Sequence, residues 1–125
     1  GEPGKPSQVD RTVKVEMKNM RFTPAQIKAT AGETILFVIS NSDQADHEFV
    51  IGDAASQVEH RNEMVSTMQM GHSMQHADPN AVAVGPGQTK NLVWKFTQSG
   101  KFEIDCNVPG HFEAGMTGVV EVVSD

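Results

Sequence analysis

The chain has 125 residues, which predicts one domain large enough to bury a hydrophobic core. Its formal net charge of −6 and isoelectric point near 5.3 argue against nucleic acid or an anionic membrane surface as a partner. The longest apolar run, residues 35–39, is far shorter than the roughly 18 residues that predict a membrane span. The single cysteine excludes an internal disulfide but leaves the redox compartment open.

The beginning of the chain differs in composition from the remainder. Residues 1–8 are rich in glycine and proline and predict a flexible tail, which is followed by a single domain over residues 9–125. The chain starts without a signal-peptide pattern, so we expect a processed mature form from which any targeting segment is missing.

Alternating apolar residues predict short strands along the domain. Residues 9–17 alternate apolar with charged side chains, which is typical of a half-buried strand. Residues 34–40 are β-branched and aromatic, which predicts a strand covered on both faces. The other predicted strands include residues 47–51, 92–96, 102–106 and 119–123. About seven or eight such strands, separated by Gly, Pro and Asn turns, predict an all-β fold, a Greek-key β-sandwich.

The segment from Cys106 to Met116 gathers three side chains that bind soft metals. Four residues separate Cys106 from His111, and four separate His111 from Met116. A turn at Pro109 and Gly110 can bring all three side chains onto one ion. His47, at the start of an upstream strand, must reach the same end of the sandwich. Two imidazoles, a thiolate and a weak axial thioether are the ligands of a blue-copper site.

Each of these four residues has a simpler explanation when it is taken alone. A lone cysteine or methionine is commonly core filler, and a histidine on a strand is commonly just hydrogen-bonded. Their combination and spacing favour a metal site over these explanations. Zinc is the main rival, but a thioether is a poor ligand for zinc, which prefers closed sets of thiolate and imidazole. Thiolate with thioether suits copper in both oxidation states.

The Cys-x4-His-x4-Met loop resembles that of the cupredoxins, the small blue-copper proteins, and in particular their rusticyanin-type members. The resemblance covers about residues 9–53 and 81–123. Strand and turn signals similar to those of the family stand at residues 20–24, 31–34, 85–89 and 99–102. The resemblance implies the cupredoxin fold, one type 1 copper held by His47, Cys106, His111 and Met116, and a periplasmic location.

The same resemblance implies a role for each ligand. Cys106 would give the strongest bond and the charge-transfer colour, and Met116 would set the reduction potential. His111 would be the exposed edge for electron passage, in an apolar docking patch formed by Pro109, Phe112 and Ala114.

Two neighbours of the ligands leave alternatives open. Where many relatives have a small polar residue after the first histidine, this chain has Glu48. Its carboxylate could stabilise Cu(II), could stay protonated and donate a hydrogen bond, or could point to solvent. Asn107 could support the site through a hydrogen bond or could satisfy only the local turn.

An insert over about residues 54–80, partly helical or irregular, is rich in methionine and histidine. Its candidates for secondary copper capture are His60, Met64, Met68, Met70, His72, Met74 and His76. The first three are spaced by four residues and would share one face if residues 54–68 are helical. Thioethers favour Cu(I), so the tract suits weak, exchangeable capture. The alternatives are that these methionines pack the helix onto the sandwich or that the tract is a solvated loop.

Two functions follow for a monomeric, non-catalytic protein. It could carry electrons between redox partner proteins, with a purely structural insert. It could instead handle copper for copper tolerance, together with a copper donor or acceptor protein. The insert resembles those of cupredoxins associated with copper resistance, which favours the second function. An oxidase or nitrite reductase would need paired His-x-His motifs and a longer chain, and the type 1 ligand set leaves no open position for substrate.

Overall fold

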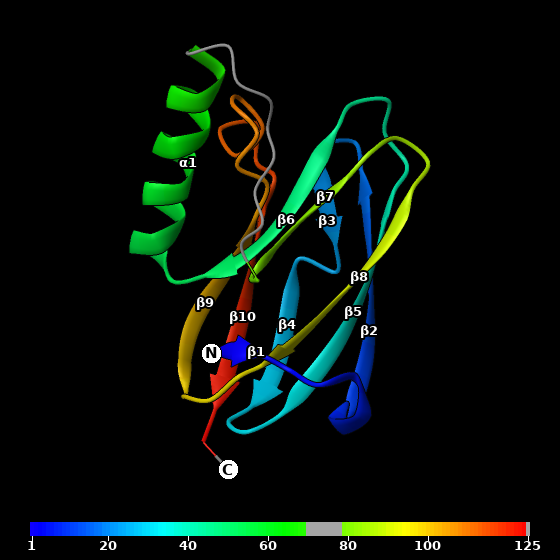
Figure 1. Cartoon of the computed structure of the whole chain (residues 1–125), viewed down its shortest axis with the longest axis vertical. Coiled ribbons are helices and arrows are strands. Elements are labelled where there is room, and N and C mark those ends of the chain that lie inside the picture. The colour runs from blue at the N-terminus through cyan, green and yellow to red at the C-terminus, as the bar shows by residue number, and fades with distance from the viewer. Residues whose placement is uncertain (70–78, 125) are drawn as a thin grey trace.

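The computed structural model describes residues 1–69 and 79–124. In this part of the chain, ten strands form two five-stranded sheets, and one α-helix lies beside one end of the sandwich (Figure 1). The arrangement confirms the predicted β-sandwich. Across the described ranges, the structure contains no helix that is long and apolar enough to cross a membrane.

The two sheets combine parallel and antiparallel pairs. In spatial order, the first sheet consists of β1 (Glu2–Pro3), β8 (Thr89–Lys95), β5 (Thr34–Asn41), β2 (Arg11–Lys18) and β3 (Arg21–Thr23). The second consists of β4 (Gln26–Thr30), β10 (Thr117–Val123), β9 (Gly100–Asp105), β6 (His47–Gly52) and β7 (Ala81–Val84). The pairs β2–β5 and β4–β10 are parallel, and the remaining pairs are antiparallel.

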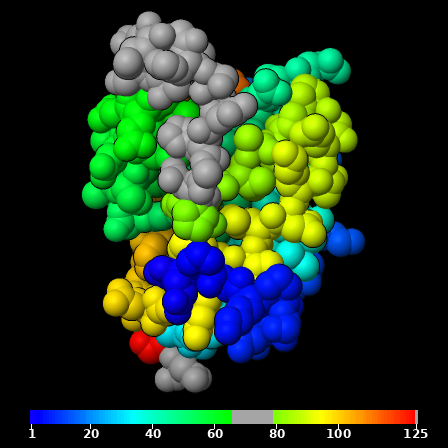
Figure 2. Space-filling view, viewed as in Figure 1, coloured from blue at the N-terminus to red at the C-terminus, as the bar shows by residue number. Residues whose placement is uncertain are grey.

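The strand count exceeds the seven or eight expected because two strands are too short to show a periodic pattern. β3 has three residues and β1 has two. Within residues 1–8, which were expected to form a tail, β1 pairs antiparallel with the edge of β8, and the N-terminal residues lie against the rest of the molecule (Figure 2). Pro3 is tolerated there because an edge strand does not need every N–H for pairing. Pro6–Gln8 add a short 3-10 helix.

Aromatic and aliphatic side chains from both sheets fill the space between them. Ile35, Phe37 and Ile39 of β5 are fully buried, whereas Leu36, Val38 and Ser40 on the other face of this strand are half-buried. One face of β5 is therefore fully covered, rather than both as predicted. Phe49 of β6 packs against Phe37, with ring centroids 5.2 Å apart, and edge-on against Phe22 at 5.9 Å.

Helix α1 (Ala54–Gln69) forms the first part of the insert. Asp53 caps its N-terminus by accepting a 2.8 Å hydrogen bond from the backbone N–H of Ser56. Gln57, His60 and Met64 are buried and form the inward stripe of the helix, at the spacing expected for one helical face. The helical alternative for this part of the insert is therefore correct.

Candidate metal centre

The predicted ligands meet where three strands of the second sheet begin or end. His47 opens β6, Cys106 directly follows β9, and Met116 directly precedes β10. The loop between β9 and β10 carries His111 and lies beside the upper part of α1 (Figure 1). Its ends are closed by a 3.2 Å hydrogen bond from the Cys106 N–H to the Met116 carbonyl.

Three side chains converge within this loop and β6. The Nδ1 atoms of His47 and His111 lie 3.1 Å apart. The Cys106 Sγ lies 3.8 Å from the His47 Nδ1 and 3.5 Å from the His111 Nδ1. Bonds of about 2.0 Å to imidazole and about 2.3 Å to thiolate would bring one ion within reach of all three donors. Met116, the fourth predicted ligand, is fully buried at the end of the same loop.

Asp43 orients the His47 ring. The His47 Nε2 lies 2.8 Å from Asp43 Oδ2, so the proton belongs on Nε2 and Nδ1 keeps a lone pair for a metal. Asp43 also accepts hydrogen bonds from the backbone N–H groups of Asn19 at 2.7 Å and Met20 at 3.0 Å. Burial acts to raise the pKa of Asp43, but these bonds and His47 outweigh it, so the pKa lies below its usual value. Sequence reasoning assigned Asp43 only to a turn, although its position four residues before His47 was an available signal.

The Cys106 thiol is enclosed. It is fully buried, and the backbone N–H of Glu48 donates to its sulfur at 3.3 Å. Burial raises the pKa of Cys106 to about 12, although backbone hydrogen bonds from Glu48 and Val108 act to lower it. A metal ion that takes the thiolate must therefore displace a proton.

We expect Cys106 to resist alkylation in the folded, metal-free protein. At pH 7.5 and equal reagent concentration, iodoacetamide should modify it at least about a hundredfold more slowly than in guanidinium, because the native thiol is buried and protonated. The chain has one cysteine, so the mass of the adduct reports this site alone. Equal rates in native and unfolded protein would contradict the enclosed geometry.

Glu48 points toward helix α1. Its side chain is buried, and Oε1 lies 3.0 Å from the Nε2 of His60. The alternative in which Glu48 faces solvent is therefore wrong. Met64 is fully buried, as expected if the methionines of this face pack the helix onto the sandwich, and His60 is buried in its contact with Glu48.

Met70, His72, Met74 and His76 lie outside the described residues, as does the side chain of Met68.

The residues on either side of Cys106 also contact the helix. The Asn107 amide donates to Gln57 Oε1 at 2.7 Å. Arg61 donates to Asn107 Oδ1 at 2.8 Å and to Asp105 Oδ2 at 3.1 Å. Burial and the neighbouring Glu103 raise the pKa of Asp105 to about 7, against the opposing hydrogen bonds from Thr117 and Arg61. Asn107 therefore links the cysteine loop to α1 and does more than satisfy a local turn.

His111 lies at the partly open side of the centre. Its ring is half-buried, and Pro109 and Ala114 beside it are exposed, as expected for an apolar edge. Phe112 is half-buried because the Arg61 guanidinium covers its ring at 3.7 Å from the centroid. Burial and the neighbouring His47 lower the pKa of His111, which favours the neutral imidazole that a metal requires.

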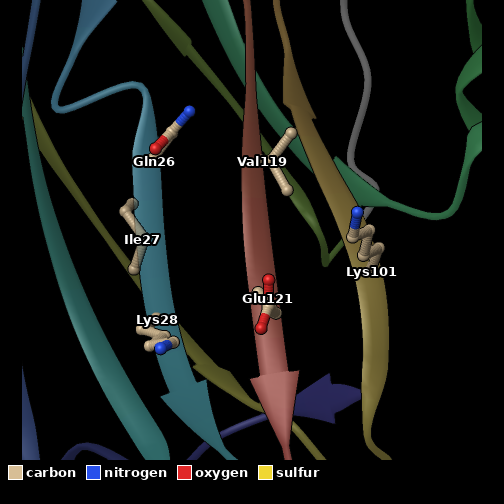
Figure 3. A pocket seen from close by; sticks show the side chains of 6 residues that line it. All are labelled: Gln26, Ile27, Lys28, Lys101, Val119 and Glu121. Carbon is tan, nitrogen blue, oxygen red and sulfur yellow. The ribbon is translucent and has the colours of Figure 1, made fainter.

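A separate depression lies on the second sheet, away from the metal ligands. It has a volume of about 410 Å³ and is lined by Gln26, Ile27, Lys28, Lys101, Val119 and Glu121 (Figure 3). These residues include no histidine, cysteine or methionine, so the depression offers no soft donor for copper.

The donor set fits copper. Its convergent imidazole nitrogens and sulfur are all buried or half-buried, and the buried Met116 at the end of the same loop carries a thioether, which suits copper and is a poor ligand for zinc. Copper held by these residues supplies a one-electron redox couple.

A β-sandwich that presents two histidines and a cysteine at one end is the architecture of the cupredoxins. Residues 9–123 match the family of copper binding proteins described as the plastocyanin/azurin family, and the chain belongs to this family. It is also similar to proteins named copper-resistant cuproprotein CopI. The relative from Rubrivivax gelatinosus is 48% identical over 98% of this chain and 72% of its own length. Those from Pseudomonas aeruginosa and Vibrio cholerae are 37% and 36% identical over 98% of this chain, and 81% and 71% of their own lengths.

Solved structures of blue copper proteins share the fold. The dithionite-reduced auracyanin of Roseiflexus castenholzii superimposes with a TM-score of 0.75, at 21% identity, over 92% of this chain and 98% of its own. Auracyanin B gives a TM-score of 0.72 at 19% identity, over 92% of this chain and 90% of its own. These matches confirm the predicted cupredoxin fold.

Proposed function

We propose that this cupredoxin serves copper tolerance in the periplasm through redox-active copper bound at a type 1 site. The observation that carries the proposal is the convergence of His47, Cys106 and His111, with donor atoms 3.1–3.8 Å apart. Met116 would be the axial ligand. The similarity to relatives named copper-resistant cuproproteins supports the tolerance role.

The protein's own residues hold the ligands before any metal arrives. Asp43 fixes the tautomer and orientation of His47, and the Glu48 N–H fixes the sulfur. Backbone hydrogen bonds within the loop hold His111 and Met116 at fixed positions. Ligands that keep one geometry in both oxidation states reduce the rearrangement that accompanies electron transfer, which suits reversible redox exchange.

The proposal assigns copper capture to the later part of the insert. His60 contacts Glu48 and Met64 is fully buried, so these two residues are poorly available for exchangeable binding. Capture of Cu(I) would then fall to Met70, His72, Met74 and His76, with Met68 as a further candidate. Exchange would connect the tract with a copper donor or acceptor protein.

An electron carrier is the second candidate. The half-buried His111, flanked by the exposed Pro109 and Ala114, favours it because this edge can approach a redox partner. For either role we propose a protein without catalysis of its own. Measurable turnover with nitrite or phenols would overturn that part of the proposal.

The two functions are separated by copper stoichiometry. The metal-free protein is titrated with Cu(II) and with Cu(I) against a competing chelator. We expect one equivalent of Cu(II) and additional equivalents of Cu(I), because thioethers prefer the reduced ion. Replacing Met70, His72, Met74 and His76 by serine should remove only the additional equivalents and reduce growth in copper.

Substitution of the neighbouring polar residues Thr67, Gln69, Ser73 and Gln75 by alanine is the matched control and should change neither result. One equivalent in both oxidation states, with growth in copper unaffected by loss of the protein, would contradict the tolerance role. That result would favour the electron carrier.

Met116→Gln should lower the reduction potential of the copper-loaded protein. An amide oxygen is a harder donor than a thioether and favours Cu(II). Cyclic voltammetry at one pH measures the change, with Met20→Gln as the control at a half-buried methionine outside the ligand set. A potential unchanged by Met116→Gln would show that Met116 is not the axial ligand.

A further inference from the structure

Helix α1 contacts the loop between β9 and β10 through a connected network of polar side chains centred on Arg61. Arg61 bonds to Asp105, which precedes Cys106, and to Asn107, which follows it. Its guanidinium also covers the ring of Phe112, the residue after His111. One side chain of the helix therefore touches the neighbours of two predicted copper ligands.

The partners of Arg61 are themselves held firmly. The Asp105 side chain is fully buried and also accepts a hydrogen bond from Thr117. Asn107 donates to Gln57, whose amide in turn donates to the backbone carbonyls of Val50 at 2.9 Å and Glu103 at 3.1 Å. Loss of Arg61 would remove the hydrogen bonds to two buried acceptor oxygens, Asp105 Oδ2 and Asn107 Oδ1. The remaining bonds from Thr117 to Asp105 and from Asn107 to Gln57 do not replace them, which favours opening or rearrangement of the loop.

The geometry of the contacts calls for a guanidinium. A planar group with several N–H donors can bond two acceptors and stack on an aromatic ring at once, whereas a lysine ammonium is a point charge. Attachment of the helix to the sandwich alone would not require this combination, because Gln57 and Met64 of α1 already lie fully buried against it.

We propose that Arg61 is a positioning residue for the copper site, through which helix α1 fixes the Cys106 and His111 segments of the loop. The inference rests on the type 1 site proposed above. The positive charge of the Arg61 guanidinium, which lies beside the residues flanking Cys106, also disfavours Cu(II) relative to Cu(I).

The test compares Arg61→Ala and Arg61→Lys with the matched control Arg11→Ala. Arg11 bonds to Glu33 and to the Lys28 carbonyl, and it lies at the opposite end of β2 from the site. In the metal-free proteins, alkylation of Cys106 by iodoacetamide at pH 7.5 reports opening of the loop. In the copper-loaded proteins, the visible spectrum and the reduction potential report the ligand geometry and the local charge.

We expect Cys106 to react about tenfold faster or more in Arg61→Ala, because hydrogen bonds to charged groups are lost. Its reduction potential should fall and its visible bands should change in relative intensity, because the cation is removed and the ligands shift. Compared with Arg61→Ala, Arg61→Lys should recover part of the reduction potential because it keeps the positive charge. It should recover little of the protection of Cys106 against alkylation. Arg11→Ala should match the unchanged protein in every readout.

The proposal would be overturned if Arg61→Ala kept the thiol reactivity, visible spectrum and reduction potential of the unchanged protein and lost only melting temperature. Arg61 would then serve only to attach helix α1 to the sandwich. If Arg61→Ala does not fold, Arg61→Lys decides, and full thiol protection in it would overturn the proposal. The thiol measurement uses no copper, so a failure of the copper-tolerance proposal does not affect it.

Discussion

Cys106→Ala is expected to abolish the intense visible absorption of the copper-loaded protein. The thiolate is the donor that produces such a band by charge transfer in a blue-copper site, and the three other predicted ligands contain no second thiolate. Copper affinity should also fall by orders of magnitude, because the strongest bond is lost. Visible absorption and competition with a chelator measure the two effects.

The β-sandwich itself should survive this substitution. Cys106 is buried at one end of the core, and removal of its sulfur leaves a cavity of roughly one atom, a loss of about 1 kcal/mol. Far-ultraviolet circular dichroism should be unchanged. Cys106→Ala keeps the histidines, so any copper that the variant still binds without the intense band is bound by histidine and not at a type 1 site. A variant that retains the band would show that Cys106 is not the thiolate ligand.

The metal centre was accessible to sequence reasoning because its determinants are local. Cys106, His111 and Met116 stand in one short segment, and the spacing of Cys106 and His111 around a Pro-Gly turn predicted the approach of these two side chains, whose Sγ and Nδ1 atoms lie 3.5 Å apart. His47 could be added because a histidine at the start of a strand is placed at the end of a sheet. Asp43 was missed, although its separation of four residues from His47 is also short.

The contacts of helix α1 with the sandwich could not be predicted from the sequence. Arg61 lies 44 residues from Asp105 and 46 from Asn107, and no periodicity links positions so far apart. The buried pair of Glu48 and His60 depends in the same way on how the helix docks against β6. Strand β1 was missed for a different reason, because two residues cannot show an alternating pattern.

Phe49→Ala should cause a large loss of stability. Phe49 is fully buried, and its ring contacts Phe22 of the first sheet edge-on and Phe37 of β5 at 5.2 Å. Truncation of a buried phenylalanine costs about 3–5 kcal/mol, through lost transfer free energy and the cavity left behind. The total free energy of unfolding of a domain of this size is roughly 5–15 kcal/mol, so this loss would be a substantial part of it.

Denaturant unfolding of the metal-free protein measures this loss, with Val119→Ala as the matched control. Val119 is 39% exposed on β10, and its truncation should change the free energy of unfolding by no more than about 0.5 kcal/mol. Phe49 lies two residues after His47 on the same strand, so its cavity should also weaken copper binding by loosening β6. A loss below about 1 kcal/mol for Phe49→Ala would contradict the packing of the two sheets around this ring. A large loss of stability with unchanged copper affinity would instead show that the ligand end of β6 is held by Asp43 and the cysteine loop, independently of the aromatic core.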